Sequence, residues 1–159
     1  MTVKTGIGYD IHRFAEGRKL MLGGVEIPYH RGLDGHSDAD VLLHAVCDAI
    51  LGALGKGDIG EHFPNTNPKY KDIASSELVK KVNDILQDEG FMISNVDVVL
   101  QAEEPNISKY KSQMRFHIAY LLALDESCVN IKATTQERLW AIGNKEGIAA
   151  FASVLIYKE

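Results

Sequence analysis

The chain has 159 residues, 45% hydrophobic and 25% charged, which is ordinary for a globular protein, and we expect a single domain over residues 1–159. Its net charge of −5 argues against nucleic acid or an anionic membrane as the main partner, but leaves room for a small anionic substrate held by a metal. With no apolar run of about 18 residues, no signal-like N-terminus and only Cys47 and Cys128 as thiols, we expect a cytoplasmic protein without a membrane span.

The first part of the chain is predicted to form a strand, a hairpin and a helix. Residues 3–14 indicate a strand, in which Gly6 and Gly8 mark the close approach of another backbone or of a ligand. Residues 20–27 predict a hairpin that turns at a Gly-Gly pair. Residues 36–54 predict a loop that runs into a helix.

The start of that helix is the richest stretch of polar groups in the chain. Ser37 or Asp38 can cap it, and a free helix N-terminus favours anions such as phosphate. Asp40, His44 and Asp48 recur at every fourth residue and therefore share one stripe, opposite an apolar stripe that faces the core. The stripe indicates either a metal or phosphate site or a solvated face with one incidental histidine, and this stretch alone favours the solvated face.

The middle of the chain alternates helices and strands. Residues 55–60 are glycine-rich, and residues 63–68 form a loop that is either a flexible connector or a substrate lid. Periodicity and turn residues then predict, in order, a helix over 75–90, a strand over 93–102, a helix from Pro105 to about Leu124, a strand over 128–135 and a helical turn over 137–143.

The last predicted strand, residues 147–157, is apolar on both faces, as is typical of a central strand covered on both sides. The order of elements predicts an α/β fold, an α+β two-layer sandwich with a mixed β-sheet, helices packed on one face and a small hairpin. We expect the second face to be covered by other copies of the chain, in a homo-oligomer whose sheets pack together. The alternative is a monomer with helices on both faces.

One candidate metal site comes from two segments. In a strand, Asp10 and His12 point to the same face, and His44 from the following helix adds a third ligand. One carboxylate and two imidazoles leave a fourth tetrahedral position open, as in catalytic zinc sites, where the ion polarises a phosphoryl oxygen. The alternative is that Asp10 and His12 only pair with each other.

Two further segments have candidate substrate contacts. Residues 132–137 leave a strand with two threonines and then Glu137, a set that can hold phosphate oxygens and Mg²⁺. The alternative is an ordinary threonine-rich strand followed by a solvated acid. Asp58 could accept hydrogen bonds from substrate hydroxyls, although Gly-Asp turns are common.

Taken together, these motifs carry a resemblance. Asp10-Ile11-His12, the 36–40 block with His44, the 57–60 segment and the 132–137 segment occur in the order that resembles the 2-C-methyl-D-erythritol 2,4-cyclodiphosphate synthase family of the non-mevalonate isoprenoid pathway. The resemblance covers nearly the whole chain. It implies a homotrimer with sheets facing the threefold axis and active sites between subunits. The implied reaction cyclises 4-diphosphocytidyl-2-C-methyl-D-erythritol 2-phosphate and releases CMP.

The resemblance also implies roles for individual residues. Asp10, His12 and His44 would bind Zn²⁺ or another divalent ion, and Glu137 would bind Mg²⁺ or Mn²⁺ with the substrate diphosphate. His36, with Ser37, and Thr135 match positions that stabilise the transition state. The other implied substrate contacts are Ile11, Asp58, Ile59, Gly60, Phe63, Pro64, Asn65, Thr66, Asn67 and Gln136. An adjacent subunit would contribute the cytidine pocket, lined with Thr135 by Ala102, Pro105, Asn106, Ile107, Ser108, Ala133 and Thr134.

Several positions depart from the family's pattern. Asn106 stands where a lysine near the nucleotide phosphates is usual, and Asn65 and Asn67 stand where acids are common. Ala141 and Asn144 replace a phenylalanine and an arginine that in relatives line an axial cavity for an isoprenoid diphosphate. The resemblance therefore does not extend that ligand to this chain. Two other functions fit the same residues, a zinc phosphohydrolase and a non-catalytic trimeric nucleotide- or isoprenoid-binding module.

Overall fold

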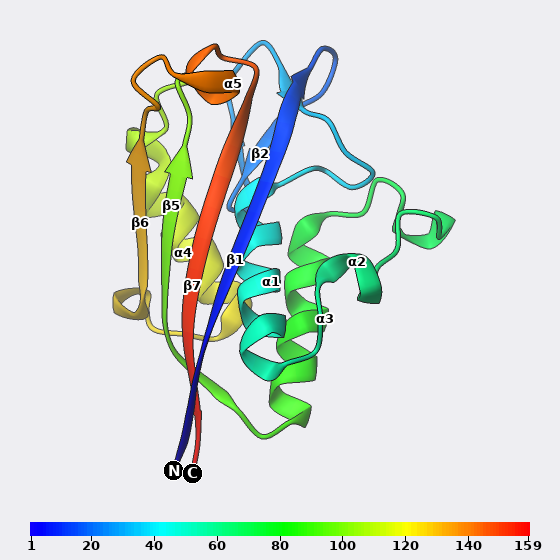
Figure 1. Ribbon diagram of the computed structural model, residues 1–159, viewed down its shortest axis with the longest axis vertical. Helices are drawn as coiled ribbons and strands as arrows, with labels where there is room; N and C mark the ends of the chain where they lie inside the picture. The colour runs from blue at the N-terminus through cyan, green and yellow to red at the C-terminus, as the bar shows by residue number, and fades with distance from the viewer.

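A five-stranded mixed sheet and three long helices form two layers in the computed structural model, which describes residues 1–159 (Figure 1). The strand order is β4-β1-β7-β5-β6, and only β5 and β6 run parallel. The strands are β1 (Thr2–Ala15), β4 (Gly32–Leu33), β5 (Met92–Gln101), β6 (Val129–Thr134) and β7 (Gly147–Lys158). The predicted α/β class and mixed sheet are confirmed, and β7 is central as predicted.

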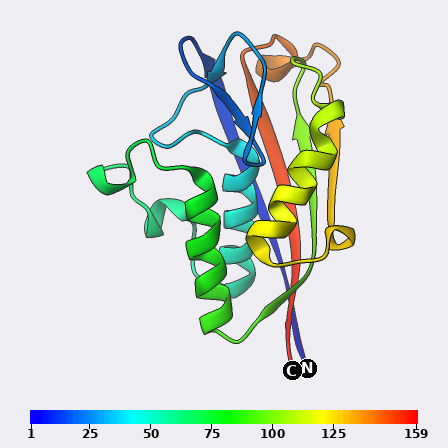
Figure 2. The ribbon, with the colours of Figure 1, turned by 180° about the vertical axis from the view of Figure 1, so that it is seen from behind.

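The long helices α1 (Val41–Leu54), α3 (Ser75–Asp88) and α4 (Lys111–Leu122) all lie against one face of the sheet, as Figure 2 shows from behind. The predicted hairpin is present as β2 (Leu20–Leu22) and β3 (Val25–Ile27). The short elements are the helices α2 (Ile59–His62) and α5 (Trp140–Gly143) and the 3₁₀ turns η1 (Pro68–Tyr70), η2 (Ser108–Tyr110) and η3 (Glu126–Cys128). The chain has no helix that is both long and apolar enough to cross a membrane.

The helix α1 packs directly on the backbone of β1. A Cβ added at Gly8 would overlap the backbone oxygen of Ala45 and lie 2.8 Å from the nitrogen of Ala49, and one added at Gly6 would lie 2.6 Å from the nitrogen of Ala53. The close backbone approach predicted from these two glycines is therefore confirmed. Because no side chains separate the two elements at this point, polar groups further along β1 come within bonding distance of α1.

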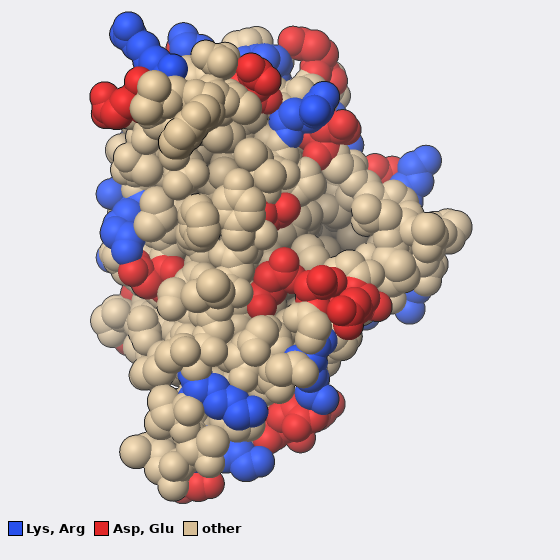
Figure 3. All heavy atoms as spheres, viewed as in Figure 1, with Lys and Arg blue, Asp and Glu red and all other residues tan.

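The other face of the sheet has no helix over it. Its apolar side chains are exposed to solvent: Ile7 is 80% exposed, and Tyr9, Ile11 and Phe151 are about half exposed. Charged side chains gather mainly around the edges of this face, which is largely uncharged at its centre (Figure 3). The alternative of helices on both faces of a monomer's sheet is therefore wrong.

The start of α1 differs from the sequence prediction. Asp40, rather than Ser37 or Asp38, caps the helix by accepting a hydrogen bond from the nitrogen of Leu43 at 3.1 Å. It also accepts from the backbone nitrogens of Gly23 and Gly24 and is fully buried. The prediction of a solvated polar stripe fails here because the hairpin folds over this side of the helix.

Two other helix starts also differ. Pro105 does not open α4, which begins at Lys111 after a loop in which Asn106 accepts a hydrogen bond from the nitrogen of Ser108. The helical turn predicted from Glu137 begins only at Trp140, because Glu137 and Arg138 have positive φ values of 51° and 62°. The short strand β4 and the helix α2 were not predicted.

Candidate metal centre and active site

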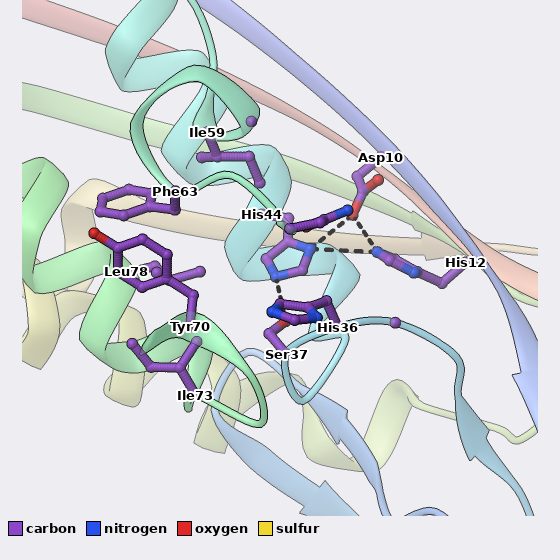
Figure 4. A pocket seen from close by; sticks show the side chains of 13 residues that line it. Asp10, His12, His36, Ser37, His44, Ile59, Phe63, Tyr70, Ile73 and Leu78 are labelled. Carbon is purple, nitrogen blue, oxygen red and sulfur yellow. Dashed lines mark hydrogen bonds and ion pairs between the residues drawn. The ribbon is translucent and has the colours of Figure 1, made fainter. Parts of the chain in front are cut away.

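Three side chains from β1 and α1 converge at the edge of the helix layer. Asp10 and His12 leave β1 on the same face, and His44 lies in the first turn of α1. The Oδ2 atom of Asp10 lies 2.8 Å from Nε2 of His12 and 3.0 Å from Nδ1 of His44, and those two nitrogens are 3.3 Å apart. The predicted grouping of these residues is therefore present in the fold (Figure 4).

The second nitrogen of each ring has its own partner. Nδ1 of His12 lies 2.6 Å from the backbone oxygen of Asp34, and Nε2 of His44 lies 2.9 Å from Oγ of Ser75 and 3.1 Å from Oγ of Ser37. A ring nitrogen that donates to such an oxygen leaves the other nitrogen unprotonated and free to bind a metal. The free nitrogens in this arrangement are the two that face Asp10.

Charge pairing accompanies this geometry. Burial raises the pKa of Asp10, but the hydrogen bonds and charges of His12 and His44 outweigh burial and lower that pKa to about 2. Burial lowers the pKa of His12, but its contacts with Asp10 and Asp34 outweigh burial and raise the pKa above 6.5. Asp10 is thus held ionised, ready to bind a cation.

The donor set fits a divalent metal ion. One carboxylate oxygen and two imidazole nitrogens, all within 4.8 Å of one another, are ligands that Zn²⁺ accepts in catalytic sites. The three side chains lie on the wall of a cavity, so a ligand in the cavity could occupy the remaining coordination position.

This cavity, of about 240 Å³, has a polar and an apolar part. The polar part contains the metal-ligand candidates with His36 and Ser37, and Nε2 of His36 is buried without a hydrogen-bond partner. The apolar part is formed by Ile59, Phe63, Tyr70, Ile73 and Leu78 (Figure 4). Such a cavity suits a ligand with an anionic end and a short carbon skeleton.

Some predicted contacts lie beside this cavity rather than on its wall. Asp58 is exposed and caps α2 by accepting a hydrogen bond from the nitrogen of Glu61. Asp48 accepts one from the nitrogen of Ile59, and its pKa is raised by burial and by the nearby charges of Asp58 and Asp10.

The segment predicted as a lid contributes only part of its length. Phe63 and Asn65 line the cavity, as does Gly60 just before the segment, whereas the other residues predicted as contacts there, Pro64, Thr66 and Asn67, do not. Asn67 instead caps the turn η1 by accepting from the nitrogen of Lys69. Ile11, also predicted as a substrate contact, belongs to the open face of the sheet and is 46% exposed.

A second group of predicted residues surrounds a separate cavity of about 240 Å³. It is lined by Ala102, Glu103, Pro105, Asn106, Ile107, Ser108, Ala133, Thr134 and Thr135. Gln136 and Glu137 lie next to it, with Glu137 accepting a hydrogen bond from Thr135 at 3.3 Å. Within one chain, the two cavities share no lining residue.

Sequence reasoning missed several residues of the first cavity. Gly35, Tyr70, Ile73 and Leu78 line it, and Ser75 contacts His44. Both Ser75 and Leu78 were predicted only as part of a helix over residues 75–90. No signal in the sequence connected the segment from Tyr70 to Ser75 with a helix thirty residues earlier.

The two-layer fold and the Asp-His-His group beside a cavity define the class, an α/β enzyme with three residues that could hold a metal ion. A model of the YgbB family matches residues 3–157, and the chain therefore belongs to the YgbB family. A curated relative from Chlorobium phaeobacteroides, named 2-C-methyl-D-erythritol 2,4-cyclodiphosphate synthase, is 58% identical over 154 residues, which cover 97% of this chain and 98% of the relative.

Solved structures are similar over almost the whole chain. The bifunctional IspDF from Campylobacter jejuni superimposes with a TM-score of 0.95 at 46% identity, and the match covers 99% of this chain but only 43% of that one. IspF from Plasmodium falciparum, in a CDP complex, gives a TM-score of 0.87 at 34% identity and covers 99% of this chain and 97% of its own.

Proposed function

We propose that residues 1–159 form one cyclodiphosphate synthase domain, a phosphorus–oxygen lyase of isoprenoid precursor biosynthesis. Its substrate is 4-diphosphocytidyl-2-C-methyl-D-erythritol 2-phosphate. An oxygen of the 2-phosphate attacks the β-phosphorus, the bond from that phosphorus to the CMP oxygen breaks, and CMP leaves with the electron pair. The other product is 2-C-methyl-D-erythritol 2,4-cyclodiphosphate.

The grouping of Asp10, His12 and His44 on the wall of a half-apolar cavity carries this proposal. A relative with 58% identity over nearly its whole length bears the name of this synthase. Zn²⁺ at these three residues would neutralise diphosphate charge and make the phosphorus more electrophilic. This explains how a chain with a net charge of −5 can act on a polyanion.

The protein's own residues bind and orient the substrate. The attacking and leaving groups belong to one molecule, so positioning supplies much of the acceleration and no protein nucleophile is needed. The buried and unpartnered Nε2 of His36 is available to a phosphate oxygen beside the metal ligands. The apolar part of the cavity accommodates the methylerythritol carbons, with Asp58 and Gly60 at its rim as partners for hydroxyl groups.

The residues around the second cavity bind the nucleotide. We propose that cytidine occupies the cavity between Ala102 and Thr135. Glu137 would hold Mg²⁺ or Mn²⁺, which would neutralise charge on the diphosphate, and Thr135 would stabilise the charge that develops on it. Asn106 at this cavity offers an amide, so any phosphate charge here is balanced by Lys109 or Lys111 or by the metal. Because the two cavities are separate within one chain, one subunit provides the metal centre and its neighbour the nucleotide cavity.

This division requires an oligomer. We propose a homotrimer whose open sheet faces meet around the threefold axis, which covers the exposed side chains of Ile7, Tyr9, Ile11 and Phe151. Both cysteines are free, as expected for the reducing cytoplasm in which we place the enzyme.

The first experiment is ³¹P NMR of the purified protein with this substrate, Zn²⁺ and Mg²⁺ or Mn²⁺. We expect resonances of a cyclic diphosphate and CMP to appear together. Free inorganic phosphate would instead identify a zinc phosphohydrolase, and binding of the nucleotide without turnover would identify a binding module. Either outcome would contradict the proposal.

Two variants test the assigned metals. His44→Ala should lose both bound zinc and turnover, because it removes one of three ligands. Glu137→Ala should keep stoichiometric zinc, measured by elemental analysis, but turn over slowly at every Mg²⁺ or Mn²⁺ concentration. Loss of zinc from Glu137→Ala would mean that the two sites are not separate.

A further inference from the structure

A chain of polar groups extends from the metal-ligand candidate His44 through Ser75, at the start of α3, to Asp38 in the loop before α1. Oγ of Ser75 lies 2.9 Å from Nε2 of His44 and donates a hydrogen bond to Oδ1 of Asp38. The backbone nitrogen of Ser75 donates to Oδ2 of the same carboxylate at 3.0 Å. Ser75 is fully buried and His44 is 6% exposed, so the bond between them is shielded from water, whereas Asp38 at the far end is half-buried.

The directions of these hydrogen bonds are set by the chemistry of the groups. A metal on Nδ1 of His44 requires that Nε2 bear the ring proton and donate it. The hydroxyl of Ser75 already donates to a carboxylate, so its lone pairs are free to accept that N–H. Donation to Asp38 also makes the hydroxyl oxygen a better acceptor. The chain of groups is therefore complementary to a His44 ring that carries a proton on Nε2, and the neutral form of that ring leaves Nδ1 free for the metal.

Ser37 is the competing acceptor, and it is the poorer one. Its Oγ lies 3.1 Å from Nε2 of His44 and also accepts a hydrogen bond from the nitrogen of Ala39. No carboxylate accepts from its hydroxyl. Ser75, at 2.9 Å and hydrogen-bonded to Asp38, is the stronger partner for the ring.

The same residues join two segments that flank the cavity. Asp38 donates from its nitrogen to the oxygen of Ile73 at 3.1 Å, and Asp72 donates to the oxygen of His36 at 2.8 Å. His36 and Ile73 both line the cavity. Ser75 is thus the point at which the start of α3, the cavity-lining loop and the metal centre are tied together.

We propose that Ser75 and Asp38 are positioning residues for the metal centre, which fix the ring orientation and tautomer of His44. The proposal rests on the metal site of the proposed function and adds a role for two residues outside the ligand set. Partners of this kind typically change metal affinity by about 10- to 100-fold when they are removed.

The test measures binding of the metal alone. Ser75→Ala removes the acceptor, and Ser76→Ala makes the same chemical change at the next residue of α3, whose hydroxyl forms no hydrogen bond with His44. Zn²⁺ affinity is measured by competition with a chromophoric chelator, and the visible spectrum of the Co²⁺-loaded protein reports ligand geometry. We expect Ser75→Ala to bind Zn²⁺ about 10- to 100-fold more weakly with altered Co²⁺ bands, and Ser76→Ala to match the parent.

A double-mutant cycle tests the link to Asp38. Asp38→Asn should weaken Zn²⁺ binding when it is made alone in the parent protein. Added to the Ser75→Ala variant, it should have little further effect on Zn²⁺ affinity, because both changes interrupt the same chain of hydrogen bonds. If Ser75→Ala does not fold, as judged by circular dichroism, Asp38→Asn alone provides the test. Parent-like Zn²⁺ affinity and Co²⁺ spectra in these variants would overturn the proposal, as would a large loss in Ser37→Ala with none in Ser75→Ala.

A further variant separates failure of this inference from failure of the proposed function. His44→Ala defines the affinity that remains without this ligand. If the parent binds Zn²⁺ no more tightly than His44→Ala, the proposed metal centre is wrong, and this inference falls with it. If the parent binds tightly and Ser75→Ala binds equally tightly, only the positioning role is wrong.

Discussion

At the scale of single residues, the proton on His12 competes with the metal ion. Contacts with Asp10 and Asp34 outweigh burial and raise the pKa of His12 above 6.5, so Nε2, the nitrogen that faces Asp10, keeps its proton to a higher pH than in an ordinary histidine. Zinc must displace this proton. We expect Zn²⁺ affinity to fall as the pH is lowered through the raised pKa, approaching about tenfold per pH unit for this one proton.

Asp10 should add nothing to this dependence, because its pKa of about 2 keeps it ionised over the whole range. The measurement is the Zn²⁺ dissociation constant between about pH 5.5 and 8.5, together with the protons released on binding. A dissociation constant that does not change over this range would show that His12 is not a ligand.

Individual residues also show which features of the site can be predicted from the sequence. The spacing of Asp10 and His12 placed both on one strand face, because side chains in strands alternate, and this prediction is confirmed. Asp40 was predicted to lie on a solvated stripe of the helix. This prediction was wrong because its partners, Gly23 and Gly24, belong to a hairpin about seventeen residues earlier in the chain. Tertiary contacts of this kind leave no periodic signal in the sequence.

At the scale of elements, β1 and α1 position the metal ligands through direct backbone contact. Gly8→Ala would force a Cβ into the backbone of α1 at Ala45, where no flexible side chain can move away. We expect a loss of at least about 1–3 kcal/mol of stability. Gly52→Ala is the matched control, because its nearest neighbour would be the oxygen of Ile7 at 3.6 Å.

The two variants should therefore change stability in opposite directions. Gly52 is exposed on α1, and alanine there should stabilise the helix by about 0.5–1 kcal/mol. Thermal unfolding midpoints at one protein concentration, without added metal, provide the comparison. An unchanged midpoint for Gly8→Ala would mean that β1 and α1 can separate at no cost, contrary to the packing.

Most of the long elements and the hairpin were predictable, whereas β4, α2 and the starts of α4 and α5 were not. Hydrophobic periodicity, with glycines at the ends of elements, predicted the bounds of β1, β5, β7, α1 and α3 to within a few residues. The start of α4 was misplaced, since a proline suits a loop as well as a first helical turn. The helix α5 starts later than predicted because two non-glycine residues with positive φ precede it. The side-chain types of these residues do not predict that backbone conformation.

At the scale of the whole molecule, the open face of the sheet sets the assembly. Ile7 is 80% exposed near the middle of β1, and a lysine there would place a charge in the proposed interface between subunits. We expect Ile7→Lys to sediment as a 17.5 kDa monomer that still binds Zn²⁺ but has lost turnover, since a neighbour's nucleotide cavity is then absent.

Phe116→Lys is the control for this change. Phe116 is 58% exposed on α4, and this helix packs on the face of the sheet opposite the open one (Figure 2). Sedimentation velocity should give this variant the mass of the parent assembly. A trimeric Ile7→Lys, or an active monomer, would contradict the proposed arrangement of subunits.

The first and last strands of the chain, β1 and β7, pair with each other, so the sheet does not depend on where along the sequence the chain begins and ends. Thr2 lies opposite Lys158, and both chain ends emerge together at one end of the sheet (Figure 1). Asp10 is eight residues further along β1, roughly 27 Å away in an extended strand. A short peptide could therefore join the ends and the chain could be reopened at a distant loop, giving a circular permutant with the same sheet. A partner domain fused to either end would likewise project from one place, remote from the metal centre.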